Sequence, residues 1–138
     1  ALTLSNRDRD CVMKLHRLLN HLPSDVPEYR RYRASVGDLI GSHLAIEDVL
    51  HPVSAETARE ALAILPPLKA GNQPLVDGHL LATASELPFG RRLGRLKEWL
   101  FRIQIEQDLE TAEEVLSLLE VLDWAATDPE SWPDSVWP

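Results

Sequence analysis

The stretch that decides the fold is Leu75–Leu109, LVDGHLLATASELPFGRRLGRLKEWLFRIQIEQDL. At its centre, Leu87-Pro88-Phe89-Gly90 has the proline and glycine of a turn. Beyond the turn, apolar residues recur at helical spacing, which predicts a helix over residues 90–107. Arginines lie on one face of this helix, and leucines and a tryptophan lie on the other. We therefore expect a helix that packs through one face and contacts an anion through the opposite one.

The rest of the chain also shows helical patterns, separated by prolines and glycines. Ser5 and Asp8 resemble a capping box. Ser24 or Asp25 can cap a second helix that Gly37 ends. The further segments that the pattern predicts as helical are residues 6–22, 39–50, 55–65, 79–84 and 111–125. These patterns predict an all-α fold, an irregular bundle of roughly six or seven helices with an extended C-terminal tail rich in Trp and Pro.

Prolines also suggest how the chain is divided. We expect a helical, body-like subdomain over residues 1–65, a linker over 66–78, a helical, tail-like subdomain over 79–126 and an extended segment over 127–138. In the extended segment, Trp132 and Trp137 are expected to pack back on the helices.

Charge is unevenly distributed along the 138 residues, which carry a formal net charge of −8. Residues 90–102 hold five basic side chains and one acidic side chain, whereas residues 103–138 hold ten acidic and no basic ones. The overall acidity argues against a nonspecific nucleic-acid binder, but the basic segment keeps a local anion contact open.

Motifs of catalytic chemistry are missing from the sequence. There is no P-loop, no GxGxxG, no HExxH and no Cys/His pair at zinc spacing. We therefore expect no catalytic residues, no metal and no cofactor in this chain. The single cysteine and the lack of a long apolar run predict a cytoplasmic chain without a membrane segment. Its start at Ala1 suggests a processed chain or a piece excised from a longer one.

Two basic groups are candidates for an anion-binding surface. On the predicted helix, Arg91, Arg95 and Arg102 fall within about 40° of one another around the axis. This stripe is either an ordinary solvated face or a phosphate-binding surface, where arginine favours bidentate contacts. The second group lies beside Tyr29 and Tyr32, which either stack on bases or belong to the core. The candidate RNA-binding residues are Arg91, Arg92, Arg95, Lys97, Arg102, Arg30, Arg31 and Arg33.

Several short motifs occur in an order typical of one enzyme family. Gly78-His79-Leu80-Leu81 is followed by Leu87-Pro88-Phe89-Gly90-Arg91-Arg92-Leu93-Gly94, and then by the junction Gln107-Asp108-Leu109-Glu110-Thr111-Ala112-Glu113-Glu114. Residues 76–121 thereby resemble the C-terminal tail of class II tRNA nucleotidyltransferases (CCA-adding enzymes) and bacterial poly(A) polymerases. Residues 2–19 are similar to the start of the helical body in that family.

The resemblance implies a body and tail that hold tRNA, without the catalytic head domain. In the family, Mg²⁺ and CTP or ATP bind in that head, so this chain is expected to bind tRNA or another structured RNA but to transfer no nucleotide alone. A head domain is a further expected partner. Replacing Arg91 and Arg95 together with Glu should then weaken tRNA binding without unfolding the chain.

Two other interpretations stay open at this point. One is a helical protein-interaction domain without RNA affinity, which the tryptophans and the acidic C-terminal region favour and which predicts a homodimer. The other is a small helical hydrolase whose site follows no recognised motif.

Overall fold

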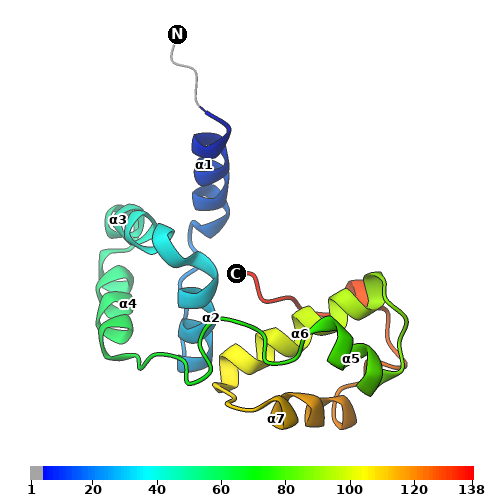
Figure 1. Cartoon of the computed structure of the whole chain (residues 1–138). Helices are drawn as coiled ribbons and strands as arrows, with labels where there is room; N and C mark the ends of the chain where they lie inside the picture. Colours follow the sequence, from blue (N-terminus) through cyan, green and yellow to red (C-terminus); the bar gives the residue numbers. More distant parts are fainter. Residues whose placement is uncertain (1–4) are drawn as a thin grey trace. The chain divides into compact units, whose positions relative to one another are not determined.

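The computed structural model describes residues 5–138 and contains seven α-helices and no strand among them, so the predicted all-α class is confirmed (Figure 1). Residues 2–4 of the segment that resembles the family's helical body lie outside the described part. The helices are α1 (Asn6–Leu18), α2 (Val26–Val36), α3 (Ile40–Leu50), α4 (Pro52–Ile64), α5 (Gly78–Ser85), α6 (Arg91–Gln107) and α7 (Ala112–Ser117). Short 3₁₀ turns occupy Gly37–Leu39, Leu118–Glu120 and Pro129–Ser131.

Side-chain caps explain where most of these helices begin. Ser5 and Asp8 form the predicted capping box at α1, each side chain accepting from the other's backbone N–H. Asp25, Asp77 and Thr111 cap α2, α5 and α7 in the same way, by accepting from the amide three residues later. These interactions are local, which is why the sequence pattern located the helix starts at Ser5, Asp25 and Thr111, although it did not identify the cap at Asp77.

Three predicted boundaries were wrong. The first helix ends at Leu18 rather than near residue 22, because Asn20 adopts a left-handed conformation, with φ 66°. Pro52 is the first residue of α4 instead of a spacer before it, as suits a residue without an N–H. The last helix stops at Ser117 and gives way to a 3₁₀ turn, not to a helix reaching residue 125.

The chain divides into two compact units, Ala1–Leu65 with Trp137–Pro138, and Pro66–Val136. In the first unit, Tyr32 is fully buried and packs in one cluster with Leu18 and Trp137. The indole of Trp137 meets the Tyr32 ring edge-on at 5.7 Å and donates to the His21 carbonyl at 2.8 Å. The expectation that Trp137 packs back on the helices is thus confirmed.

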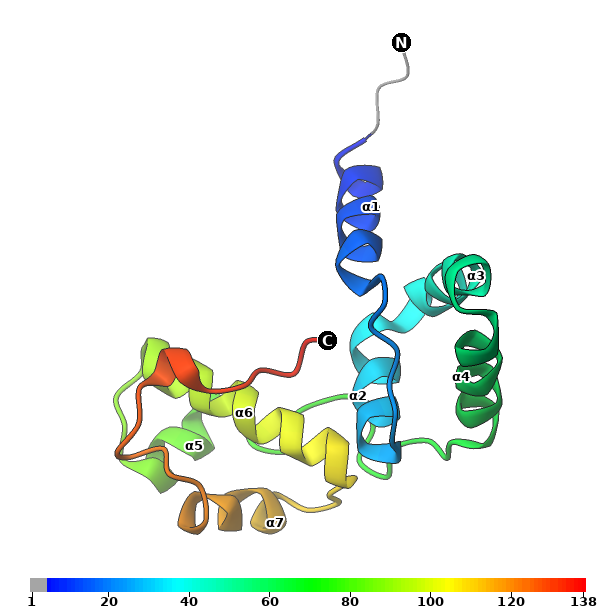
Figure 2. The same cartoon turned by 180° about the vertical axis from the view of Figure 1, so that it is seen from behind.

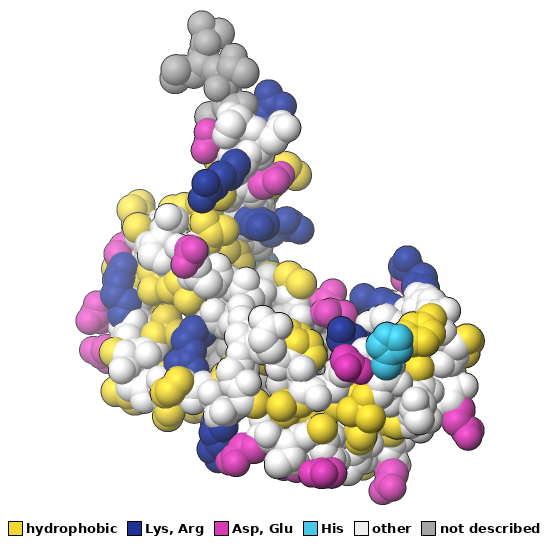
Figure 3. Space-filling view, viewed as in Figure 1, with side chains coloured by type: hydrophobic (Ala, Val, Ile, Leu, Met, Phe, Trp, Pro, Cys, Tyr) yellow, Lys and Arg dark blue, Asp and Glu magenta, His cyan; other side chains and the backbone are white. Residues whose placement is uncertain are grey.

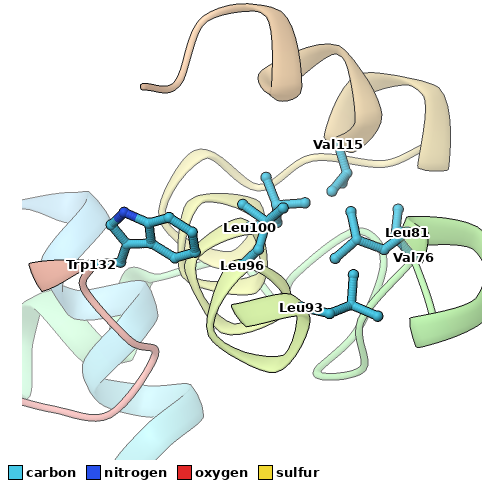
Figure 4. Packing of buried hydrophobic residues seen from close by; sticks show 7 residues of the cluster. All are labelled: Val76, Leu81, Leu93, Leu96, Leu100, Val115 and Trp132. Carbon is cyan, nitrogen blue, oxygen red and sulfur yellow. The ribbon is translucent and has the colours of Figure 1, made fainter. Parts of the chain in front are cut away.

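The second unit is built around α6. Leu93, Leu96 and Leu100 point from α6 toward Leu81 of α5 and Val115 of α7, as Figure 4 shows. Residues 66–78 belong to this unit, and Val76 from that segment is 3 % exposed in the same cluster. Within this unit, residues 127–136 run back along α6, as both Figures 1 and 2 show, and Trp132 from this segment is buried.

No helix in the described part of the chain combines the length and the apolar character needed to cross a membrane.

Candidate nucleic-acid interface

The N-terminus of α6 is an open helix end. Its N-cap is Gly90, and no described side chain caps the first-turn amides, which have no partner within the helix. Gly90 adopts φ 157° and ψ −167°, a conformation that L side chains rarely adopt. A Cβ added there would meet nothing within 4 Å, so backbone conformation rather than crowding requires the glycine. The arrangement leaves amide donors and a positive dipole end accessible to an anion.

An exposed aromatic side chain stands directly before this helix end. Phe89 is 65 % exposed, and its ring meets the His79 imidazole edge-on with 5.1 Å between centroids. The turn is held beneath it by Ser85, whose hydroxyl accepts from the Leu87 amide at 3.3 Å. An aromatic ring beside a free helix N-terminus is suited to stacking a base while the amides approach its phosphate.

Arg91 adds a cation to the same corner. Its side chain is 74 % exposed and forms a bidentate ion pair with Glu130, in which Nη2 donates to Oε2 at 2.8 Å. The hydrogen bond from Arg91 lowers the pKa of the Glu130 carboxyl below its usual value. Because the pair is solvated, salt screens it and a phosphate can compete for the guanidinium.

The neighbouring arginines are not solvated as expected, and this part of the sequence interpretation was wrong. Arg92 donates to the Trp124 carbonyl at 2.7 Å, and its guanidinium lies 5.5 Å from the centroid of the Trp132 ring. Arg95 donates to the carbonyls of Pro129 and Trp132, at 3.2 and 2.5 Å. These guanidiniums bind the backbone of the C-terminal segment instead of facing water.

Arg102 is also engaged on this face. It binds Glu106 at 2.6 Å and donates to the Asp134 carbonyl at 3.3 Å. Lys97 lies about 120° from Arg91 around the helix axis and is half-buried. Of the three arginines in the predicted stripe, Arg91 is therefore the exposed one. Arg95 and Arg102 hold the C-terminal segment in place.

The second predicted basic group is structural as well. Tyr29 and Tyr32 belong to the core, so they are not available for base stacking. Arg31 is 4 % exposed, with its guanidinium 4.7 Å from the centroid of the Trp137 ring. Arg33 donates to the Leu65 carbonyl at 3.0 Å, and Arg30 is half-buried.

Exposed cations that the sequence interpretation did not single out lie on α1. Arg7, Lys14 and Arg17 are exposed there, and Arg7 and Lys14 fall within about 20° of one another around the axis. Their seven-residue spacing was the available signal, but Asp8 and Asp10 between them hid it. On the face shown in Figure 3, basic and acidic side chains are interspersed and form no single basic field.

Comparison of the chain with protein-family models, with curated proteins and with solved structures found no match.

Proposed function

We propose that this chain is the RNA-binding helical region of a CCA-adding or related nucleotidyltransferase, and that it contacts tRNA through the corner formed by Phe89, Gly90 and Arg91. The catalytic head, with its Mg²⁺ and its CTP or ATP, would be a separate domain, and this chain alone would transfer no nucleotide. Two features support this function: the family-like order of the motifs, and the geometry of the Phe89–Arg91 corner at the start of α6.

The single observation that carries the proposal is the open start of α6. Uncapped amides, an exposed ring and a solvated guanidinium lie within three consecutive residues, and each matches one component of RNA. The family-like "Leu-Pro-Phe-Gly" turn is the segment that places them together. Arg92, Arg95 and Arg102 support this corner indirectly, because they hold the C-terminal segment against the helix.

The decisive experiment measures binding of a fluorescent tRNA by anisotropy at two salt concentrations. Arg91→Glu should weaken binding and lower the slope of log affinity against log salt by about one. Phe89→Ala should weaken binding while leaving that slope unchanged, because it removes stacking rather than charge. The earlier double replacement of Arg91 and Arg95 is unsuitable, since Glu at position 95 would face the carbonyls of Pro129 and Trp132 and destabilise the fold.

Arg59→Glu is the matched control. Arg59 is another surface arginine in a bidentate ion pair, with Asp48, and it lies on α4. The Arg59→Glu substitution changes the net charge by the same amount as Arg91→Glu, but away from the Phe89–Arg91 corner. It should therefore leave tRNA affinity nearly unaltered. Equal losses in the two arginine variants, or no binding of the wild type at low salt, would refute the assignment.

A protein-interaction domain is the second candidate. Val49 and Val53, on either side of the α3–α4 junction, are 83 % and 81 % exposed, which is unusual for valine. Light scattering on the same samples separates the two functions: a concentration-dependent dimer without tRNA binding would favour the second.

A further inference from the structure

A buried chain of polar side chains crosses the first unit and is not used by the proposed RNA contact. The Tyr32 hydroxyl and His43 Nδ1 are 2.7 Å apart, and His43 Nε2 is 3.2 Å from Glu47 Oε1. All three residues are fully buried. Burial, followed by the charge of Glu47, raises the pKa of Tyr32, so the phenol remains a donor to His43 at neutral pH. With Nδ1 accepting from the phenol, His43 carries its N–H on Nε2 and donates it to Glu47 Oε1.

The two carboxylate oxygens of Glu47 have different surroundings. Oε1 is satisfied, because it also accepts from the Asn20 backbone amide at 2.7 Å. Oε2 is buried and accepts no hydrogen bond from any described residue. His51 Nε2 lies 4.0 Å from Oε2, but it already donates to the Asn20 side-chain carbonyl at 2.6 Å. A buried carboxylate oxygen without a donor is costly, so it marks a place where a ligand donor would be stabilising.

Glu47 is one of the residues that line a cavity, although its side chain is closed to solvent. The cavity has a volume of about 390 Å³ and is lined by Glu47 together with Asn20, His51, Leu22, Tyr29 and Val53, among others. Its volume is in the usual range for small-molecule sites. Asn20, His51 and Val53 are exposed, so they lie at the mouth of the cavity. Leu22 and Tyr29 form an apolar and aromatic part of its wall.

The charge of the lining selects the kind of ligand. None of the described residues that line the cavity is a lysine or arginine, so the imidazole of His51 is the one lining side chain that could act as counter-ion to a phosphate or carboxylate. Glu47 supplies a buried carboxylate, and the apolar wall suits a short hydrocarbon chain. We propose that this cavity binds a small organic cation that carries N–H donors on an alkyl chain, and that the Glu47 carboxylate turns toward the cavity so that Oε2 accepts from the ammonium group.

This site is independent of the RNA contact, since it lies wholly in the first unit and uses none of the α6 residues. The described residues also contain no group of three or more His, Cys, Asp or Glu side chains placed to hold a metal ion. An alkylammonium is therefore the ligand chemistry that the donors and walls favour.

The test is a titration of the 138-residue chain with n-butylammonium, followed by amide shifts in ¹H–¹⁵N NMR spectra. We expect saturable shifts at Asn20, Glu47 and His51, with a dissociation constant on the order of millimolar for so small a probe. Glu47→Gln keeps the acceptor for His43 and Asn20 but places an amide donor where Oε2 was. It should weaken binding by about tenfold or more.

Asp48→Asn is the matched control, because it removes the same charge one residue away, from a carboxylate that pairs with Arg59 on the surface. Binding should survive in this variant. If Glu47→Gln does not fold, Thr57→Leu tests the same point by filling the cavity from the exposed face of α4, and it should abolish the shifts.

Two further probes examine the chemistry. Neutral n-butanol and tetramethylammonium, which has no N–H, should each bind at least about tenfold more weakly than n-butylammonium. No saturable shift at the cavity, equal binding of n-butanol, or unchanged affinity in both Glu47→Gln and Thr57→Leu would overturn the proposal.

Discussion

Two arginines one helical turn apart show how strongly the environment of a residue sets its role. Arg91 keeps 74 % of its side chain exposed and pairs with Glu130, a contact made through solvent-accessible atoms. The side chain of Arg95 is only 25 % exposed, and it donates to two backbone carbonyls of the C-terminal segment. An exposed ion pair is screened by salt and can exchange its partner for another ion. Removing a guanidinium that donates to backbone carbonyls leaves those carbonyls without a hydrogen-bond donor, which costs stability.

A stability comparison follows at this scale. Arg95→Ala should lower the free energy of unfolding by about 1–3 kcal/mol, because it leaves the Pro129 and Trp132 carbonyls without their donor. Arg91→Ala should leave stability almost unchanged. Urea unfolding followed by circular dichroism measures both, and coincident midpoints for the two variants would show that the Arg95 contacts are not structural.

At the scale of elements, α6 is the centre of the second unit because both of its faces are covered. Its leucine face packs against α5 and α7, and its arginine face binds the C-terminal segment. Trp132 is the buried aromatic residue in the contact between α6 and the C-terminal segment. It is 4 % exposed, its ring lies 5.5 Å from that of Trp99, and its indole donates to Thr127 at 2.7 Å. The segment is held by one aromatic anchor and several arginine–carbonyl bonds.

Trp132→Ala should therefore destabilise the second unit by about 3–5 kcal/mol, the usual cost of truncating a buried aromatic side chain. Val136→Ala is the control, since Val136 is 56 % exposed in the same segment and should change stability little. Thermal unfolding of the two variants provides the measurement. A wild-type melting temperature in Trp132→Ala would mean that the segment does not contribute to the core.

At the scale of the whole molecule, the two units differ in how their cores are assembled. The core of the second unit is drawn entirely from residues within Pro66–Val136. The core of the first unit includes Trp137, which follows the second unit in sequence. A unit whose core residues are contiguous can fold from its own segment, whereas the first unit needs the end of the chain.

A fragment of residues 66–136 should accordingly fold alone, with a helical circular dichroism spectrum and a cooperative urea transition. A fragment of residues 1–65 lacks the Trp137 indole and should unfold at a lower urea concentration than the same residues followed by a flexible linker and Trp137–Pro138. A gradual, non-cooperative loss of helix in the 66–136 fragment would contradict the division of the chain.

Much of the fold could be predicted from the sequence because it depends on local interactions. The capping box at Ser5, the caps at Asp25 and Thr111 and the leucine spacing of α6 all depend on residues within a few positions of each other. The same locality placed the turn at Phe89-Gly90, and therefore the corner on which the proposed RNA contact depends.

What the sequence by itself determined is thus the helical class, most helix starts and the two-sided character of α6. Only the tertiary structure decided which arginines face solvent, because a guanidinium is satisfied equally well by water and by backbone carbonyls that lie far away in sequence, as at Arg92, Arg95 and Arg102. The same holds for Glu47. Its spacing from His43 is visible in the sequence, but only the packed unit shows that the Asn20 amide donates to Oε1 and that the buried Oε2 has no donor. Local pattern selects the elements, and long-range packing selects which polar atoms remain available to a ligand.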